Sequence, residues 1–261
     1  MNCNNIRKPI GLKATCVEIE NTCNNAHMYR RCGLRPEHLI IPLDSGSGRT
    51  TLVEYMTDKY REAGVLNFAS GLDDYIEISF DGSLQQLKQS FAKIDSAAIY
   101  ANEYSNIVAM DISNIALHLG EVQMSEFLSG CSKVCDHATV IFFVHSHPSK
   151  NEEKLMEKIS ETVSNVKRMA VEPYTGEDIL ALIIKGITEH GIVIMNETDF
   201  CTALSDVISE GGITTVKGAN ATADTIARYA DFSGFLPVVN VGSLKKMLTS
   251  WRQDLGRNEA K

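Results

Sequence analysis

The stretch Leu39-Ile-Ile-Pro-Leu-Asp-Ser-Gly-Ser-Gly-Arg-Thr-Thr51 decides how the rest of this 261-residue sequence is interpreted. Its apolar beginning, Leu39 to Leu43, is typical of a buried strand, and the small residues from Ser45 to Gly48 predict a tight loop. The pattern that follows predicts a helix over about residues 49–63. A strand, a tight loop and a helix in this order can present backbone N–H groups to a phosphate.

The loop matches the phosphate-binding pattern G-x-x-x-x-G-K-[ST] in part. Gly48 and Thr50 match, whereas Leu43 stands at the first glycine and Arg49 at the lysine. Gly46 and Gly48 permit positive φ, and the planar guanidinium of Arg49 keeps the charge of the lysine without its compact shape. The alternative is a Gly/Ser turn that binds nothing. The predicted nucleotide-binding residues are consecutive: Asp44, Ser45, Gly46, Ser47, Gly48, Arg49, Thr50 and Thr51.

Composition limits the classes of function. The net charge is −8 and 44% of the residues are hydrophobic, so the chain can bury a core, and its charge gives no support to a nucleic-acid partner. The longest apolar runs are too short to span a bilayer, and the polar N-terminus has no signal core. Seven scattered cysteines fit a reduced, cytoplasmic protein with no membrane partner.

Strands alternate with helices up to about residue 172, which predicts an α/β domain with a parallel sheet flanked by helices. Beyond the first strand, the expected strands are 74–80, 106–112, 138–144 and 166–171, and the expected helices are 16–31, 83–94, 121–135, 152–163, 175–189, 196–210 and 222–230. The expected segments are an N-terminal extension (1–38), the α/β domain (39–172), a small helical domain (173–250) and a polar tail (251–261).

This order of elements resembles an AAA+ ATPase module, a P-loop α/β domain followed by a helical lid, over about residues 25–235. The Walker B strand of such modules is similar to Ile107-Val-Ala-Met-Asp111, and the strand with the sensor residue is similar to the run that leads into His145-Ser146. The opening of the lid resembles Pro173-Tyr-Thr-Gly-Glu-Asp-Ile179. The resemblance implies ATP or ADP as cofactor, with Mg²⁺ held by Thr50 and Asp111.

Three departures from the AAA+ pattern replace residues that take part in phosphoryl transfer in that family. Arg49 replaces the P-loop lysine, Ile112 replaces the Walker B glutamate, and Gly218-Ala-Asn-Ala-Thr-Ala has no arginine at the matching place of the lid. The catalytic positions that remain are Asp111, His145 and Ser146. Since phosphoryl transfer needs charge compensation and a positioned water, the resemblance implies nucleotide binding with weak or absent hydrolysis. It also implies assembly or remodelling with a protein partner or further copies of the chain.

Three alternatives remain. His145-Ser-His-Pro-Ser149 resembles the His-x-His-Pro of JAMM zinc metalloproteases, in which His145 and His147 would bind zinc, but Lys158 stands at the position of the third ligand and makes zinc the less favoured cofactor. Cys131 and Cys135 lie close in sequence to His137, although an apolar helix face explains them better than a nucleophile does. The third alternative is a nucleotide-free, AAA+-derived scaffold.

Overall fold

The computed structural model describes residues 8–32, 36–66, 75–78, 85–86, 88–89, 91–92 and 106–258. The chain divides into two compact units, Met1–Glu172 and Pro173–Lys261. In the first unit, the described strands form a five-stranded parallel sheet in the order β2-β3-β4-β1-β5. Their bounds are β1 His38–Pro42, β2 Tyr75–Ile78, β3 Asn106–Asp111, β4 Ala138–Val144 and β5 Val166–Arg168. The predicted parallel sheet is confirmed.

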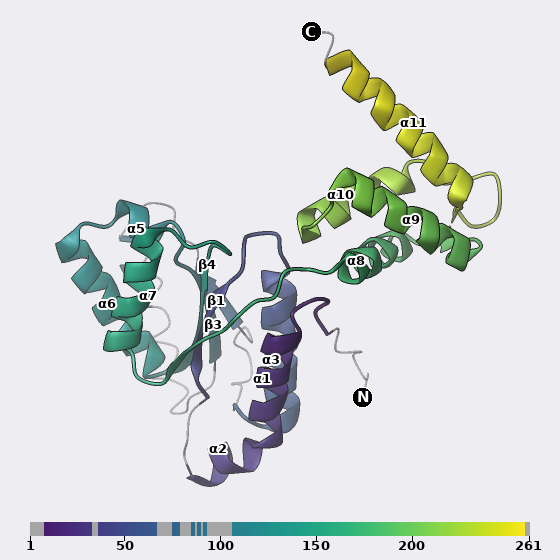
Figure 1. The fold of residues 1–261 in the computed structure, drawn as a ribbon. Coiled ribbons are helices and arrows are strands. Elements are labelled where there is room, and N and C mark those ends of the chain that lie inside the picture. Colours follow the sequence, from purple (N-terminus) through teal and green to yellow (C-terminus); the bar gives the residue numbers. More distant parts are fainter. Residues whose placement is uncertain are drawn as a thin grey trace. The chain divides into compact units, whose positions relative to one another are not determined.

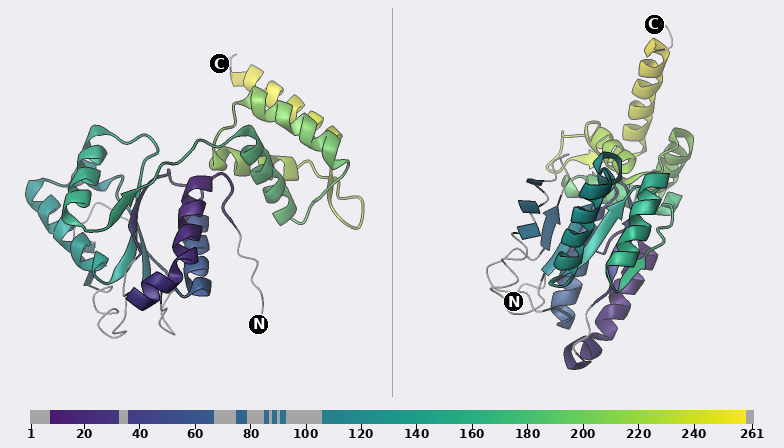
Figure 2. Two further views of the ribbon diagram at one scale, coloured as in Figure 1. Left: turned by 60° about the horizontal axis from the view of Figure 1, so that its bottom comes forward. Right: turned by 90° about the vertical axis from the view of Figure 1, so that its left-hand side faces the viewer.

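The interior strands carry apolar side chains on both faces because both faces are covered. All seven residues of β4 are buried, as are the first four of β1. Helices α1 (Lys13–Asn24) and α3 (Arg49–Ala63) pack together on one face of the sheet. Helices α6 (Glu121–Cys135) and α7 (Lys150–Thr162) cover the other face (Figures 1 and 2). The described part of this unit also contains two short helices, α2 Ala26–Cys32 and α5 Ile115–His118, and helical residues at 85–86, 88–89 and 91–92.

The register places the carboxyl ends of three neighbouring strands together. Asp111 at the end of β3 pairs with Phe143 of β4, and Phe143 pairs with Ile41 of β1. Since the strands are parallel, the segments that leave β1, β3 and β4 emerge at the same edge of the sheet. The loop that contains Gly46 and Gly48 leaves from this edge.

The second unit is mainly helical, as predicted. Its elements are α8 Gly176–Glu189, β6 Val193–Ile194, α9 Glu197–Gly211, α10 Val216–Ala227, β7 Val238–Val239 and α11 Val241–Asn258. The helices bury one apolar cluster that includes Ile183, Phe200 and Leu204, and the two short strands pair in parallel. Among the helices that the structure describes, none combines the length and apolar character needed to cross a membrane.

Several predicted boundaries are wrong for identifiable reasons. Helix α10 begins at Val216 rather than 222, because the Thr215 side chain accepts a hydrogen bond from the Gly218 N–H and caps the helix there. Helix α11 continues to Asn258, through most of the segment predicted as a polar tail. The helix predicted over 16–31 is two helices, α1 and α2, and α1 packs on α3. The predicted strand 74–80 and helix 83–94 lie partly outside the described residues.

Helices α8 and α10 approach closely at one glycine. A Cβ on Gly186 would lie 2.7 Å from the Cβ of Ala223, whereas a Cβ on Gly176 of the same helix would meet nothing within 4 Å. We expect Gly186→Ala to lower the free energy of unfolding by about 1–3 kcal/mol, although alanine is the better helix former. Gly176→Ala, the matched control, should change it by less than about 0.5 kcal/mol.

Urea denaturation followed by far-ultraviolet circular dichroism measures both variants. Adding Ala223→Gly to Gly186→Ala should recover part of the loss, because the second change removes the opposing methyl group. Equal stability of the Gly186→Ala and Gly176→Ala variants would contradict this close packing.

Candidate functional site

Two glycines shape the loop between β1 and α3. Gly46 has φ of 78° and Gly48 has φ of 87°, in the left-handed region that side-chain-bearing residues adopt only with strain. The Ser47 N–H donates to the Asp44 carbonyl at 3.1 Å and closes the turn. Helix α3 starts directly after Gly48. The strand, loop and helix expected from the sequence are therefore present.

Several backbone amides of this loop donate to no acceptor in the part of the chain that the structure describes. They belong to Gly46, Gly48, Thr50 and Thr51. The last two lie in the first turn of α3, where the helix dipole adds a partial positive charge. Free amides beside a helix N-terminus form a surface suited to an anion such as a phosphate group.

Arg49, the first residue of α3, turns back to the edge of the sheet. Its Nε donates to the Leu43 carbonyl at 2.5 Å, its Nη1 donates to Asp111 Oδ2 at 2.5 Å, and its Nη2 lies 3.4 Å from the Val144 carbonyl. The guanidinium lies over the Phe143 ring, 5.0 Å from its centroid. Only 11% of the Arg49 side chain is exposed. One side chain therefore links the ends of β1, β3 and β4.

Asp111 is engaged on both carboxylate oxygens. Oδ2 accepts from Arg49, and Oδ1 accepts from the Ser113 N–H at 3.0 Å. Burial opposes the charged form, but the hydrogen bonds from Ser113 and the nearby Arg49 charge outweigh it and lower the pKa of Asp111. The carboxylate is therefore ionised at neutral pH and is neutralised by the arginine.

A second contact joins the loop to the segment after β4. Asp44 Oδ1 accepts from the Ser146 N–H at 3.0 Å, and Asp44 Oδ2 accepts from the Ser146 hydroxyl at 2.5 Å. The hydrogen bond from the Ser146 hydroxyl is the main reason that the pKa of Asp44 is lowered. Asp44, Arg49 and Asp111 together therefore carry a formal charge of −1, from two carboxylates and one guanidinium.

His145 contacts a residue that the sequence analysis missed. Its Nδ1 lies 2.7 Å from Oε1 of Glu152, which also accepts from the His145 N–H at 3.2 Å. Glu152 Oε2 accepts from the Ser149 N–H at 2.8 Å, in a capping box that starts α7. Ser149-x-x-Glu152 is a capping signature that the sequence contains. His145 thus orients the start of α7.

The alternative sites find little support in the geometry. His147 is exposed, and the described residues contain no group of three or more His, Cys, Asp or Glu side chains that could hold a metal ion. Cys131 and Cys135 lie on the buried face of α6 and belong to the core of the first unit. Burial raises the pKa of the Cys131 thiol and raises that of Cys135 to about 12, so neither thiol forms a thiolate at neutral pH.

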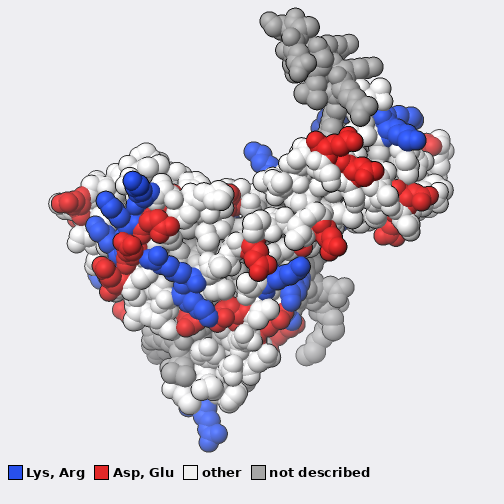
Figure 3. Space-filling view, viewed as in Figure 1, with Lys and Arg blue, Asp and Glu red and all other residues white. Residues whose placement is uncertain are grey.

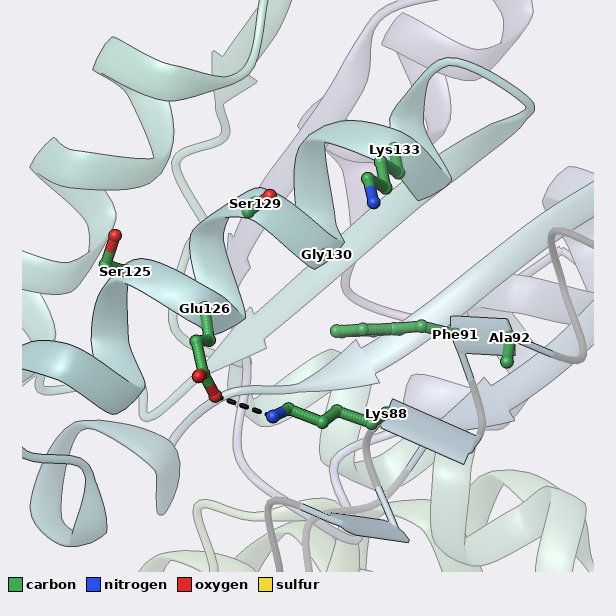
Figure 4. Close-up of a pocket in the computed structure, with 8 residues that line it drawn as sticks. All are labelled: Lys88, Phe91, Ala92, Ser125, Glu126, Ser129, Gly130 and Lys133. Carbon is green, nitrogen blue, oxygen red and sulfur yellow. Dashed lines mark ion pairs between the residues drawn. The ribbon is translucent and has the colours of Figure 1, made fainter.

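A hollow of about 470 Å³ lies beside α6, away from the loop. Figure 4 shows the Phe91 side chain pointing toward the helix at Gly130, where a Cβ would overlap its ring. Lys88 Nζ pairs with Glu126 Oε2 at 2.7 Å along the same side of the hollow. Gly130 thus has a packing role, and the ion pair already satisfies the Lys88 charge. We place the candidate site at the loop rather than here.

The contacts of Asp111 generate a prediction about stability and pH. Asp111→Asn should lower the free energy of unfolding by about 1–2 kcal/mol at pH 7, between the values typical of exposed and buried ion pairs. Because folding lowers the pKa of Asp111, the stabilisation is present above the ordinary pKa of aspartate and is lost as the pH falls through the folded value. The difference from the native protein should therefore shrink below about pH 4.

Urea denaturation at pH 7 and pH 3 measures both quantities. Asp58→Asn is the matched control, since it removes an exposed pair with Arg61 at 3.0 Å and should lower the free energy of unfolding by less than about 0.5 kcal/mol. Equal losses in the two variants at pH 7 would contradict a structural role for the Arg49–Asp111 pair.

Comparison with solved structures identifies the fold. A RuvB variant from Thermotoga maritima matches with a TM-score of 0.61 at 13% identity, over 94% of this chain and 73% of that one. Domain III of the replication initiation protein DnaA, also from Thermotoga maritima, matches with a TM-score of 0.53 at 13% identity, over 95% of this chain and 94% of that one. No protein-family model and no curated protein matches the sequence.

RuvB and DnaA domain III are AAA+ P-loop ATPases, and a further RuvB match is described as a Holliday junction branch migration motor. At this low identity the likeness establishes the fold alone. The chain has the AAA+ fold, with a P-loop-type parallel sheet followed by a helical unit.

Proposed function

We propose that this protein binds a nucleotide through the loop Asp44–Thr51, hydrolyses it slowly or not at all, and acts in assembly or remodelling with a protein partner. The observation that carries the proposal is the set of free backbone amides at the start of α3, shaped by Gly46 and Gly48 at the carboxyl edge of a parallel sheet. Backbone amides bind phosphate oxygens without a lysine, although less strongly.

Slow hydrolysis is expected from the side chains near the loop that would bind the phosphates. Ile112 stands where the resemblance expects a glutamate, and its side chain is fully buried in the core. His145 and Ser146, the other catalytic candidates, make hydrogen bonds to Glu152 and Asp44. No side chain in this group is placed to activate a water molecule, so we propose retention of the nucleotide rather than turnover.

A second candidate is an interaction protein that holds no nucleotide. One observation favours it: Phe232, Phe235 and Leu236 are exposed on a loop closed by reciprocal hydrogen bonds between the backbones of Asp231 and Val238. Exposed apolar groups of this size are typical of protein contacts. On the face seen in Figure 3, acidic and basic side chains are interspersed over α6 and α7, which does not suggest a nucleic-acid surface. A cytoplasmic location stays a prediction.

Thermal unfolding with ADP or ATP tests the proposal. At a nucleotide concentration of 100 times Kd, binding should stabilise the native protein by about 2.7 kcal/mol and raise its melting temperature. Little or no phosphate should be released from ATP over the same time. An unchanged melting temperature at millimolar nucleotide would reject nucleotide binding and favour the second candidate, an interaction protein that holds no nucleotide.

Gly48→Ala and Gly64→Ala form a matched pair for the site. Both glycines flank α3 with positive φ, 87° and 64°, so alanine should destabilise either position by about 1–2 kcal/mol. Only Gly48→Ala should also lose the nucleotide-dependent shift, because Gly48 shapes the loop and Gly64 caps the opposite helix end. Loss of the shift in both variants, or in neither, would contradict the assignment of the loop.

A further inference from the structure

The ligands expected for Mg²⁺ do not fit a metal ion in this structure. The expected protein ligands are Thr50 and Asp111, and Mg²⁺ needs close to octahedral oxygen coordination at about 2.1 Å. Asp111 Oδ2 already accepts from Arg49 at 2.5 Å, and Oδ1 accepts from the Ser113 N–H. A metal ion on Oδ2 would place two cations on one oxygen. A metal ion bound directly to Oδ2 therefore requires Arg49 to leave, and one bound to Oδ1 would be repelled by the adjacent guanidinium charge.

Arg49 is held too firmly to leave easily. Its three donor nitrogens face Leu43, Asp111 and Val144, and a planar guanidinium cannot give up one of these directions without tilting away from the others. The Phe143 ring supports one face of the guanidinium. The side chain is nearly nine-tenths buried, so little water can replace these contacts.

We propose that Arg49 is the permanent cation of this site and that the protein binds nucleotide without Mg²⁺. The inference rests on the proposed function, because it concerns the form of the nucleotide that the loop accepts. Arg49 neutralises Asp111, and the phosphate contacts come from the loop amides rather than from a metal ion. Asp44, tied to Ser146, stays on the rim as a negative charge.

Isothermal titration with ADP, once in EDTA and once in millimolar Mg²⁺, tests the inference on the native chain. We expect the two Kd values to agree within about threefold. A Kd at least tenfold lower in Mg²⁺ would overturn the inference and leave the proposed function standing, since nucleotide would still bind. Absence of binding in both buffers would overturn the proposed function and the inference with it.

Arg49→Lys is the variant that isolates the guanidinium. An ammonium keeps the charge but cannot contact Leu43, Asp111 and Val144 together, so Asp111 becomes available to a metal ion. We expect this variant to bind ADP at least tenfold more tightly in Mg²⁺ than in EDTA. Adding Asp111→Asn should remove that gain. An Arg49→Lys variant that folds and binds equally in both buffers would overturn the assignment of Arg49 as the group that excludes the metal.

Discussion

The contact between Arg49 and Asp111 is the interaction on which the site depends. Arg49 follows β1 at the start of α3, Asp111 ends β3, and the same guanidinium lies against Phe143 and the Val144 carbonyl at the end of β4. One cation therefore closes the carboxyl edge of three adjacent strands. Without it, the half-buried carboxylate of Asp111 would keep only the hydrogen bond from the Ser113 N–H, and the Leu43 and Val144 carbonyls would each lose one donor. The shape of the loop thus has internal support that does not require a ligand.

The same contact explains how the AAA+ fold can be present without the charged groups that phosphoryl transfer requires. A P-loop usually places a mobile ammonium and a metal ion on the phosphates, so that charge is compensated where it develops during transfer. Here the cation, Arg49, hydrogen-bonds to the ends of the strands instead, and it neutralises the carboxylate of Asp111. The backbone amides and the two glycines remain, because they depend on helix and loop geometry. Under the proposed function, the protein keeps the backbone amides that would bind phosphate and lacks the lysine and glutamate that would support its transfer.

Much of the fold could be predicted from local pattern. Helices α3 and α6 and strand β4 have the predicted bounds, since apolar periodicity and small or polar residues mark their ends. The contacts of the site could not be predicted in this way. Arg49 and Asp111 are 62 positions apart, and Asp44 and Ser146 are 102 apart, so no local pattern encodes these contacts. The replacement of the lysine and of the glutamate predicted a loss of chemistry, but not that the arginine would bind the remaining carboxylate.

The most direct test of the account is the side-chain NMR spectrum of the arginines in the nucleotide-free protein. The Arg49 signals are assigned by their loss in Arg49→Lys. The account predicts an Arg49 Nε–H that exchanges slowly with solvent and Nη groups whose rotation is hindered, because each nitrogen faces an acceptor. Both properties should weaken in Asp111→Asn. Arg49 signals that exchange and rotate as freely as those of the exposed Arg228 would contradict it.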